Sequence, residues 1–177
     1  MSFDDLSVRL PHYAKDLEIN LARLFADDTL TEQQKWGCFL ACAFALGQPE
    51  VLDAVSGEAR KRLNNEAMIA AKMAATIMAM NTVYYGAVNL FQNHDYRSEP
   101  PRLSMLALAN PGVDKIDFEL WALAVSALSN CQTCLNVHEA ELHKRGTPLE
   151  VVQTALRIAS VINAIAVVLR AEPSQAA

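Results

Sequence analysis

The sequence predicts an all-α protein, a helical bundle of about seven or eight helices. Alternating β-branched runs bounded by tight turns, which signal strands, are missing, whereas helix-capping residues and helix-ending glycines recur. Of the 177 residues, 52% are hydrophobic and only 6 are glycine, which favours compact packing over disorder. The length suits one domain with a substantial core, so we expect residues 1–177 to form a single domain.

Start and stop signals place the helices of the first half. Pro11 can open a helix that runs to about Asp27. Thr31 and Gln34 form a capping-box pattern ahead of an apolar segment that Gly47 would end. Two further helices are expected, from about Pro49 to Leu63 and from about Asn65 to Phe91.

A loop-rich segment over residues 92–113, with Pro-Pro and Asn-Pro-Gly as breakers, precedes the second half. Helices are then expected in "DKIDFELWALAVSALS" and in "NCQTCLNVHEAELHKRG". A last long helix has the clearest start in the chain, with Thr147 as N-cap, Pro148 at the first helical position and Glu150 closing a capping box.

A weak internal repeat suggests that the bundle has two related halves. Trp36 and Trp121 lie 85 residues apart, each in an apolar helix of similar length. Matching amphipathic helices can also produce such a likeness by chance. If the repeat is real, residues 1–98 form a non-catalytic half, and residues 110–177 form the half that carries a Cys-x-x-Cys motif.

Charge and hydropathy argue against several classes of partner. The formal net charge of −5 disfavours nucleic acid and anionic membrane surfaces. The N-terminal segment is acidic and lacks the apolar core of a signal peptide. The longest apolar stretch, "IASVINAIAVVL", is short and interrupted by Asn163, which suits a buried helix better than a membrane span. We expect a cytoplasmic protein with neither nucleic acid nor membrane as a partner.

The candidate reactive side chains are concentrated in "NCQTCLNVHEAEL", residues 130–142. With Asn130 as the N-cap, Cys131, Cys134 and His138 would share one helix face. The two sulfurs could then reach disulfide geometry, and the helix N-terminus would lower the cysteine pKa. His138 would accept or relay the proton of Cys134, directly or through one water.

These positions suggest a role for each residue. Cys134 has the base beside it and is the better nucleophile, whereas Cys131, at the helix mouth, would be better exposed to resolve the intermediate. Glu119 stands in an otherwise apolar helix, where a buried acid needs a partner. Folding back of this helix would bring Glu119 near His138 and complete a Glu–His–Cys relay. A surface position for Glu119 is the alternative.

These residue types also occur in other kinds of site. A zinc site is an alternative for the dithiol, but it normally needs four ligands, and Cys38 and Cys42 look like small core residues of an apolar helix. A thioredoxin-like motif needs a preceding strand, whereas a helix is expected here. Core filling is the expected role of the methionines Met68, Met73, Met78 and Met80.

The segments "FELW" (118–121), "CQTC" (131–134) and "NVHE" (136–139) together resemble the AhpD alkyl hydroperoxide reductases of the carboxymuconolactone-decarboxylase-like superfamily. Further likeness in "LPHYAKDLEINL", "IMAMNTVYY" and "LALANPG" extends the resemblance over nearly the whole chain. It implies an all-helical fold of two related halves and a homo-oligomer, a trimer in known relatives. It also implies a peroxidase for organic hydroperoxides with no bound cofactor or metal.

The resemblance also assigns roles at the matching positions. Cys134 would be the peroxidatic thiol that passes through a sulfenic acid. Cys131 would protonate the leaving group and then form the Cys131–Cys134 disulfide, with His138 and Glu119 as the proton relay. Dihydrolipoamide on a lipoyl-bearing dehydrogenase-complex component would re-reduce the pair, and the peroxiredoxin AhpC would be a possible client.

One position departs from the pattern, because some relatives carry a histidine where this chain has Thr133. A hydroxyl does not titrate near neutral pH, so thiol activation could be slower here. Two other functions remain as alternatives. One is a carboxymuconolactone decarboxylase-type enzyme, although that chemistry has no obvious need for a vicinal dithiol. The other is a non-enzymatic redox-sensing protein.

Overall fold

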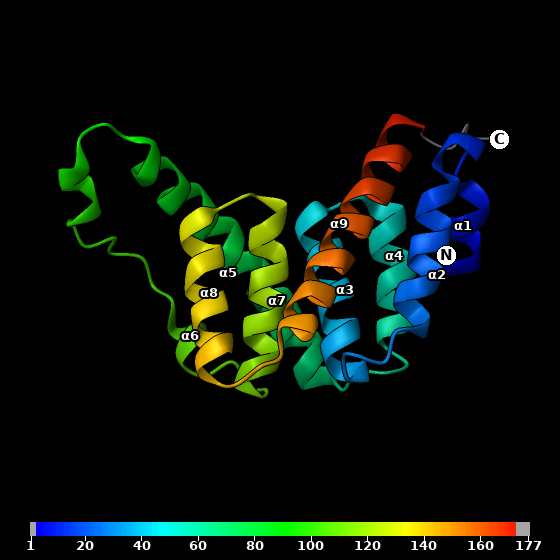
Figure 1. Ribbon diagram of the computed structural model, residues 1–177, viewed down its shortest axis with the longest axis horizontal. Helices are drawn as coiled ribbons and strands as arrows, with labels where there is room; N and C mark the ends of the chain where they lie inside the picture. The colour runs from blue at the N-terminus through cyan, green and yellow to red at the C-terminus, as the bar shows by residue number, and fades with distance from the viewer. Residues whose placement is uncertain (1–2, 173–177) are drawn as a thin grey trace.

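The computed structural model describes residues 3–172, which form a bundle of α-helices without any strand in that range (Figure 1). The predicted all-α class is confirmed. The long helices are α2 (Lys15–Ala26), α3 (Glu32–Leu46), α4 (Pro49–Ala59), α5 (Asn65–Leu90), α7 (Lys115–Leu128), α8 (Gln132–Lys144) and α9 (Leu149–Ala171). The short elements are α1 (Phe3–Arg9), α6 (Leu106–Ala109) and the 3₁₀ helices η1 (His12–Ala14) and η2 (His94–Arg97). Residues 3–172 thus hold nine α-helices, more than predicted, because α1 and α6 are too short to show a helical period.

The start and the end of α3 follow the sequence signals. The backbone N–H of Gln34 donates to Thr31 Oγ1 at 3.2 Å, and the backbone N–H of Thr31 donates to Gln34 Oε1 at 3.1 Å. This reciprocal pair is the predicted capping box. Gly47 ends the helix with a φ of 62°, a left-handed conformation that glycine adopts without strain.

The predicted starts of α2 and α9 are wrong. Pro11 opens the 3₁₀ turn η1 rather than α2, which begins at Lys15. Thr147 does not cap α9, because its buried Oγ1 has no hydrogen-bond partner. Its backbone N–H donates to Leu142 O at 3.1 Å, at the end of α8. The extended residue Pro148 is the N-cap instead, and α9 starts one residue later than predicted.

Helices α3, α5, α7 and α9 form the centre of the bundle, with α3 in contact with the other three. Trp121 of α7 is fully buried, and its Nε1 donates to Gln34 O at 3.1 Å. Gly37 of α3 faces the same indole so closely that a Cβ atom would collide with the ring. The two central helices are therefore fitted to each other at this point, with no room for a larger residue on α3.

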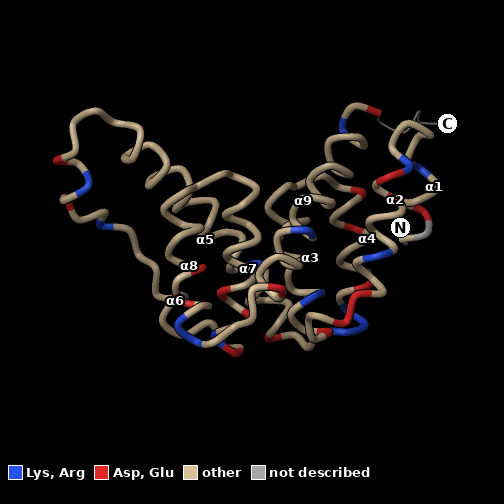
Figure 2. The backbone as a smooth tube through the Cα atoms, viewed as in Figure 1, with Lys and Arg blue, Asp and Glu red and all other residues tan. Residues whose placement is uncertain are grey.

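Helix α9 is long and apolar enough to cross a membrane by length and composition alone. In the structure it packs against α2, α3 and α7, so part of its apolar surface is buried in the bundle. Figure 2 shows that charged residues of both signs are interspersed and gather at the lower end of the bundle. The surface of α9 that meets its neighbours is apolar because it belongs to the core.

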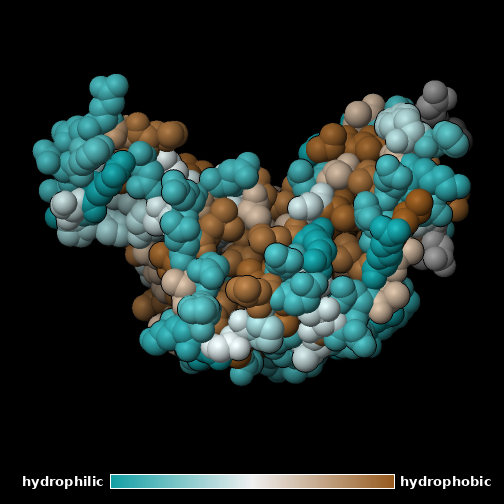
Figure 3. All heavy atoms as spheres, viewed as in Figure 1, coloured by the Kyte–Doolittle hydropathy of each residue, from teal (hydrophilic) through white to brown (hydrophobic). Residues whose placement is uncertain are grey.

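The molecule is V-shaped in the view of Figure 1, because the end of α5 and η2 project away from the bundle. We call residues 91–104 the arm. All residues from 91 to 100 are exposed, so the arm has little contact with the rest of its own chain. Figure 3 shows a hollow beside the arm whose floor is largely apolar. The fold of a single chain thus leaves an extended segment and an apolar hollow uncovered.

Candidate active site

The dithiol lies at the start of α8, although the cap differs from the prediction. Asn130 is not the N-cap, because it takes a left-handed φ of 50° in the tight link after α7. Cys131 is the N-cap, and its Sγ accepts a hydrogen bond from the backbone N–H of Cys134 at 3.4 Å. The cysteine side chain itself therefore satisfies a free amide of the first helical turn.

The two sulfurs lie in contact inside the protein. Both cysteines are free thiols, and the distance between Cys131 Sγ and Cys134 Sγ is 2.6 Å. The expectation that Cys131 is the more exposed thiol is wrong, because the exposed fractions are 3% for Cys131 and 5% for Cys134. As a cap, Cys131 folds over the first turn rather than pointing outward. A disulfide between the two needs only a small displacement within this turn.

Burial dominates the acidity of Cys134. Desolvation, together with the hydrogen bond and the charge of Cys131, raises the pKa of Cys134 to about 12, although a backbone hydrogen bond acts in the opposite direction. The expected lowering of the pKa at a helix N-terminus is therefore outweighed. A thiolate at Cys134 requires a nearby proton acceptor or a compensating positive charge.

Glu119 and His138 form the expected pair. Glu119 Oε2 lies 2.5 Å from His138 Nδ1, and the two residues are 4% and 5% exposed. The alternative of a surface position for Glu119 is therefore wrong. Burial opposes ionisation of Glu119, but hydrogen bonds from His138 and Lys115 outweigh it, so the pKa of this carboxyl is lower than its ordinary value. The carboxylate fixes the Nδ1–H tautomer of the ring.

Lys115 was not anticipated from the sequence as part of this site. Its Nζ lies 2.8 Å from Glu119 Oε1 and also donates to Leu108 O at 2.6 Å. The available signal was the spacing of four residues between Lys115 and Glu119, which places the two side chains on the same face of a helix. Lys115 thus neutralises the buried carboxylate and ties α7 to the short helix α6.

Met78 is the second residue that the sequence did not indicate. His138 Nε2 lies 3.1 Å from Met78 Sδ, whereas none of the hydrogen bonds of the described residues joins His138 to either thiol. Met78 is 1% exposed, as predicted for a core residue. Its spacing along α5 carries no sign of a polar contact, because the contact comes from the packing of α5 against α8.

Thr133, between the two cysteines, is tied to the end of α5. Asn89 Nδ2 donates to Thr133 Oγ1, and Arg97 Nη2 of η2 donates to Asn89 O at 3.0 Å. These bonds connect the base of the arm with the first turn of α8. The hydroxyl at position 133 therefore makes a structural contact in this chain and is directed at α5.

The other cysteines match their predicted core role. Cys38 and Cys42 are fully buried in α3. Burial raises the pKa of Cys38 well above its ordinary value and that of Cys42 to about 12. No group of three or more His, Cys, Asp or Glu side chains within residues 3–172 is arranged to hold a metal ion.

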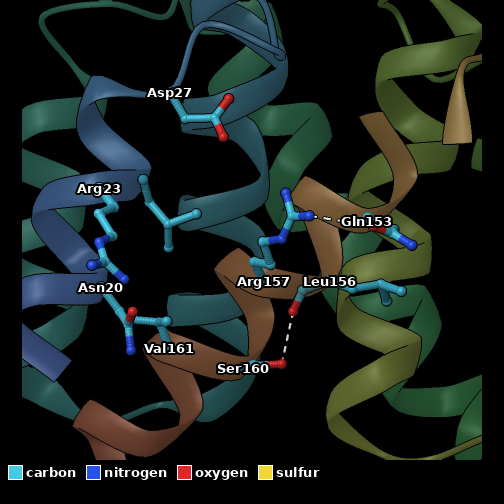
Figure 4. Close-up of a pocket in the computed structure, with 9 residues that line it drawn as sticks. Asn20, Arg23, Asp27, Gln153, Leu156, Arg157, Ser160 and Val161 are labelled. Carbon is cyan, nitrogen blue, oxygen red and sulfur yellow. Dashed lines mark hydrogen bonds between the residues drawn. The ribbon is translucent and has the colours of Figure 1, made fainter. Parts of the chain in front are cut away.

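One pocket lies remote from the dithiol. It has a volume of about 580 Å³ and lies between α2 and α9 (Figure 4). Arg157 on its wall is already engaged by Glu150 at 2.7 Å and by Gln153 at 3.2 Å. Neither Cys131, Cys134 nor His138 lines this pocket. The reactive side chains therefore lie in the buried cluster at α5, α7 and α8 rather than in this pocket.

Known proteins resemble this chain over its whole length. The model of the carboxymuconolactone decarboxylase family matches residues 100–173, which include α7, α8 and α9. A protein of Maricaulis maris named alkyl hydroperoxide reductase AhpD is 54% identical over 97% of this chain and 99% of its own length. Proteins of the same name from Hyphomonas neptunium and Brucella anthropi are 50% and 47% identical, over 100% and 99% of this chain and 98% and 100% of their own lengths. Identity of this degree over the full length shows that the chain belongs to the AhpD family of alkyl hydroperoxide reductases.

Proposed function

We propose that this chain is an antioxidant thiol peroxidase that reduces organic hydroperoxides through Cys131 and Cys134. The observation that carries the proposal is the pair of buried thiols 2.6 Å apart, beside the Glu119–His138 pair. The name shared by the relatives supports the substrate class. A dithiol supplies the two electrons that reduction of a peroxide bond requires, so the enzyme needs no bound cofactor.

In the proposed reaction, the Cys134 thiolate attacks one oxygen of the hydroperoxide and the O–O bond breaks. Cys134 becomes a sulfenic acid, and the departing alkoxide takes a proton from Cys131 to become an alcohol. The Cys131 thiolate then attacks the Cys134 sulfur, and the displaced hydroxide leaves as water. His138, oriented by Glu119, takes up the proton of Cys134 and returns it to the hydroxide. One hydroperoxide and two thiols give alcohol, water and a disulfide.

The disulfide must be reduced again by an external dithiol. We propose dihydrolipoamide, carried by a lipoyl-bearing component of a dehydrogenase complex, as this reductant. The peroxiredoxin AhpC is a further proposed partner, reduced through a mixed disulfide with Cys131 or Cys134. A cytoplasmic location suits these partners, because thiols stay reduced in that compartment.

We also propose that the protein is a homo-oligomer, a trimer. The arm supports this, because its aromatic residues Phe91 and Tyr96 pack on each other at 5.1 Å and remain 46% and 52% exposed. Exposed aromatic side chains on a projecting segment are typical of subunit contacts. A second copy would cover the arm and the apolar hollow beside it.

Consumption of tert-butyl hydroperoxide with dihydrolipoamide as the reductant tests the proposed function. We expect turnover by the wild-type protein and none by Cys134→Ser, whereas Cys42→Ser retains turnover because Cys42 is a core residue. Equal rates for the wild type and Cys134→Ser would contradict the assignment. If the Cys131–Cys134 disulfide forms and is reduced without peroxide turnover, the dithiol serves another substrate or a redox-sensing role.

The matched family model favours a second candidate function, decarboxylation of carboxymuconolactone. This reaction transfers no electrons to or from a thiol pair. Its distinguishing test is decarboxylation of the lactone by Cys131→Ser and Cys134→Ser proteins. Decarboxylation that survives both substitutions would favour this function over the peroxidase.

A further inference from the structure

The imidazole of His138 lies between two hydrogen-bond acceptors. Nδ1 lies 2.5 Å from Glu119 Oε2, and Nε2 lies 3.1 Å from Met78 Sδ. An ionised carboxylate only accepts hydrogen bonds, and a thioether has no proton to donate. Each contact is therefore a hydrogen bond only when the ring nitrogen carries the proton. The contact between Nε2 and Met78 Sδ therefore becomes a hydrogen bond when Nε2 takes up a proton.

We propose that Met78 is a positioning residue of the dithiol site, whose thioether accepts the Nε2–H of His138 and holds the ring as the cation that stabilises the Cys134 thiolate one helical turn away. This inference rests on the proposed thiol chemistry. When Cys134 ionises, its proton passes to Nε2 of His138, directly or through a water, and the sulfur keeps the electron pair of the S–H bond. Met78 Sδ then accepts a hydrogen bond from the new N–H group.

Burial makes this weak acceptor effective. Met78 is 1% exposed and His138 5%, so bulk water does not compete for the Nε2–H group. Without Met78, the protonated Nε2 would have no acceptor among the described contacts, and a buried charged donor without a partner is costly. The sulfur of Met78 therefore provides the partner for the Nε2–H group that proton transfer from Cys134 creates.

Among the described contacts of His138, only Met78 contacts Nε2. Glu119 and, through it, Lys115 face the ring from α7, and Cys131 and Cys134 lie on α8 itself. Among the described contacts, α5 contributes no charged group to the ring, only Met78. Since burial and Cys131 raise the pKa of Cys134 to about 12, a positive charge nearby is what the thiolate needs.

Three variants separate this role from simple core filling. Met78→Leu keeps the volume but removes the acceptor. Met68→Leu is the matched control, because Met68 lies on the same helix, is 9% exposed and has no polar contact among the described residues. Met78→Gln restores an acceptor, its amide oxygen, one bond further along a side chain of similar length, and it serves as the rescue variant.

The first measurement is the rate of Cys134 alkylation by iodoacetamide against pH, followed by peptide mass spectrometry. We expect Met78→Leu to move the midpoint upward by about half a pH unit, roughly threefold less thiolate at neutral pH. Met68→Leu should match the wild type, and Met78→Gln should return the midpoint to the wild-type value or below. An unchanged profile in folded Met78→Leu would overturn the proposal.

The second measurement is the ¹⁵N spectrum of the His138 ring in reduced protein at neutral pH. We expect a larger protonated fraction of Nε2 in the wild type and in Met78→Gln than in Met78→Leu. Equal protonated fractions in the wild type and in folded Met78→Leu would also overturn the proposal. Neither measurement requires peroxide turnover, so a wild-type protein without peroxidase activity would contradict the proposed function while these spectra still decide the role of Met78.

Discussion

Glu119 shows how one residue in an apolar helix indicates a site. A lone acid between buried residues must find partners, and the structure supplies His138 at 2.5 Å and Lys115 at 2.8 Å. The need for a partner was predictable from the sequence, as was His138 as the nearest suitable group. Lys115 as a second partner of Glu119, and Met78 as a contact of the His138 ring, could not be predicted, because both depend on how the helices pack.

The lowered pKa of Glu119 leads to a prediction about stability and pH. The carboxyl has a lower pKa in the folded protein than the ordinary value of 4.5, so its contribution is fully present above about pH 4.5 and is lost as the pH falls through the folded value. Glu119→Gln should therefore be less stable than the wild type at pH 6 and should lose less stability between pH 6 and pH 4. Urea unfolding at both pH values measures this difference.

The surface ion pair between Lys61 and Glu58, 2.6 Å long, offers the control for that experiment. It is exposed on the lysine side, and the substitution Lys61→Gln should change the free energy of unfolding by roughly 1 kcal/mol or less at either pH. An identical pH dependence in the wild type and Glu119→Gln would show that the buried carboxylate is not stabilised by its two partners.

At the scale of elements, local signals predicted helix positions better than helix starts. The capping box at Thr31 and the glycine at position 47 act through neighbours in the chain, and both were predicted correctly. Asn130 and Thr147 also have side chains that suit an N-cap, but each lies in a link whose path is set by two packed helices. There the spatial constraint outweighs the local preference, and Cys131 and Pro148 take the cap positions.

The contact between α3 and α7 leads to a prediction at this scale. Gly37→Ala should destabilise the protein by about 1–3 kcal/mol, because the added methyl group collides with the indole of Trp121. Gly86→Ala in α5 is the matched control, since nothing lies within 4 Å of its added Cβ, and it should be neutral or stabilising by up to about 1 kcal/mol. Urea unfolding of the two variants measures both effects, and equal stability would contradict the tight fit at Gly37.

At the scale of the whole molecule, the fold class and the helix that carries Cys134 and His138 were predictable, but the shape was not. Composition and periodicity specify how much surface each helix buries, yet they do not specify which direction the arm takes after α5. The division into related halves, residues 1–98 and 110–177, stays a prediction. What the structure adds is that α3 and α7, which carry Trp36 and Trp121, lie side by side in the core.

The arm gives a prediction about assembly. Phe91 and Tyr96 are half exposed on a projecting segment, so replacing both with Asp should leave the fold of one chain intact and should disrupt the contact between copies (Figure 1). We expect light scattering after gel filtration to give the mass of a trimer for the wild type and that of a monomer for Phe91→Asp/Tyr96→Asp. Val8→Asp, at an 86% exposed position on α1, is the control and should keep the wild-type mass. A wild-type monomer would contradict the proposed oligomer. A trimeric double variant would show that the subunit contact lies elsewhere on the molecule than the arm, which Arg97 and Asn89 connect to Thr133 at the start of α8.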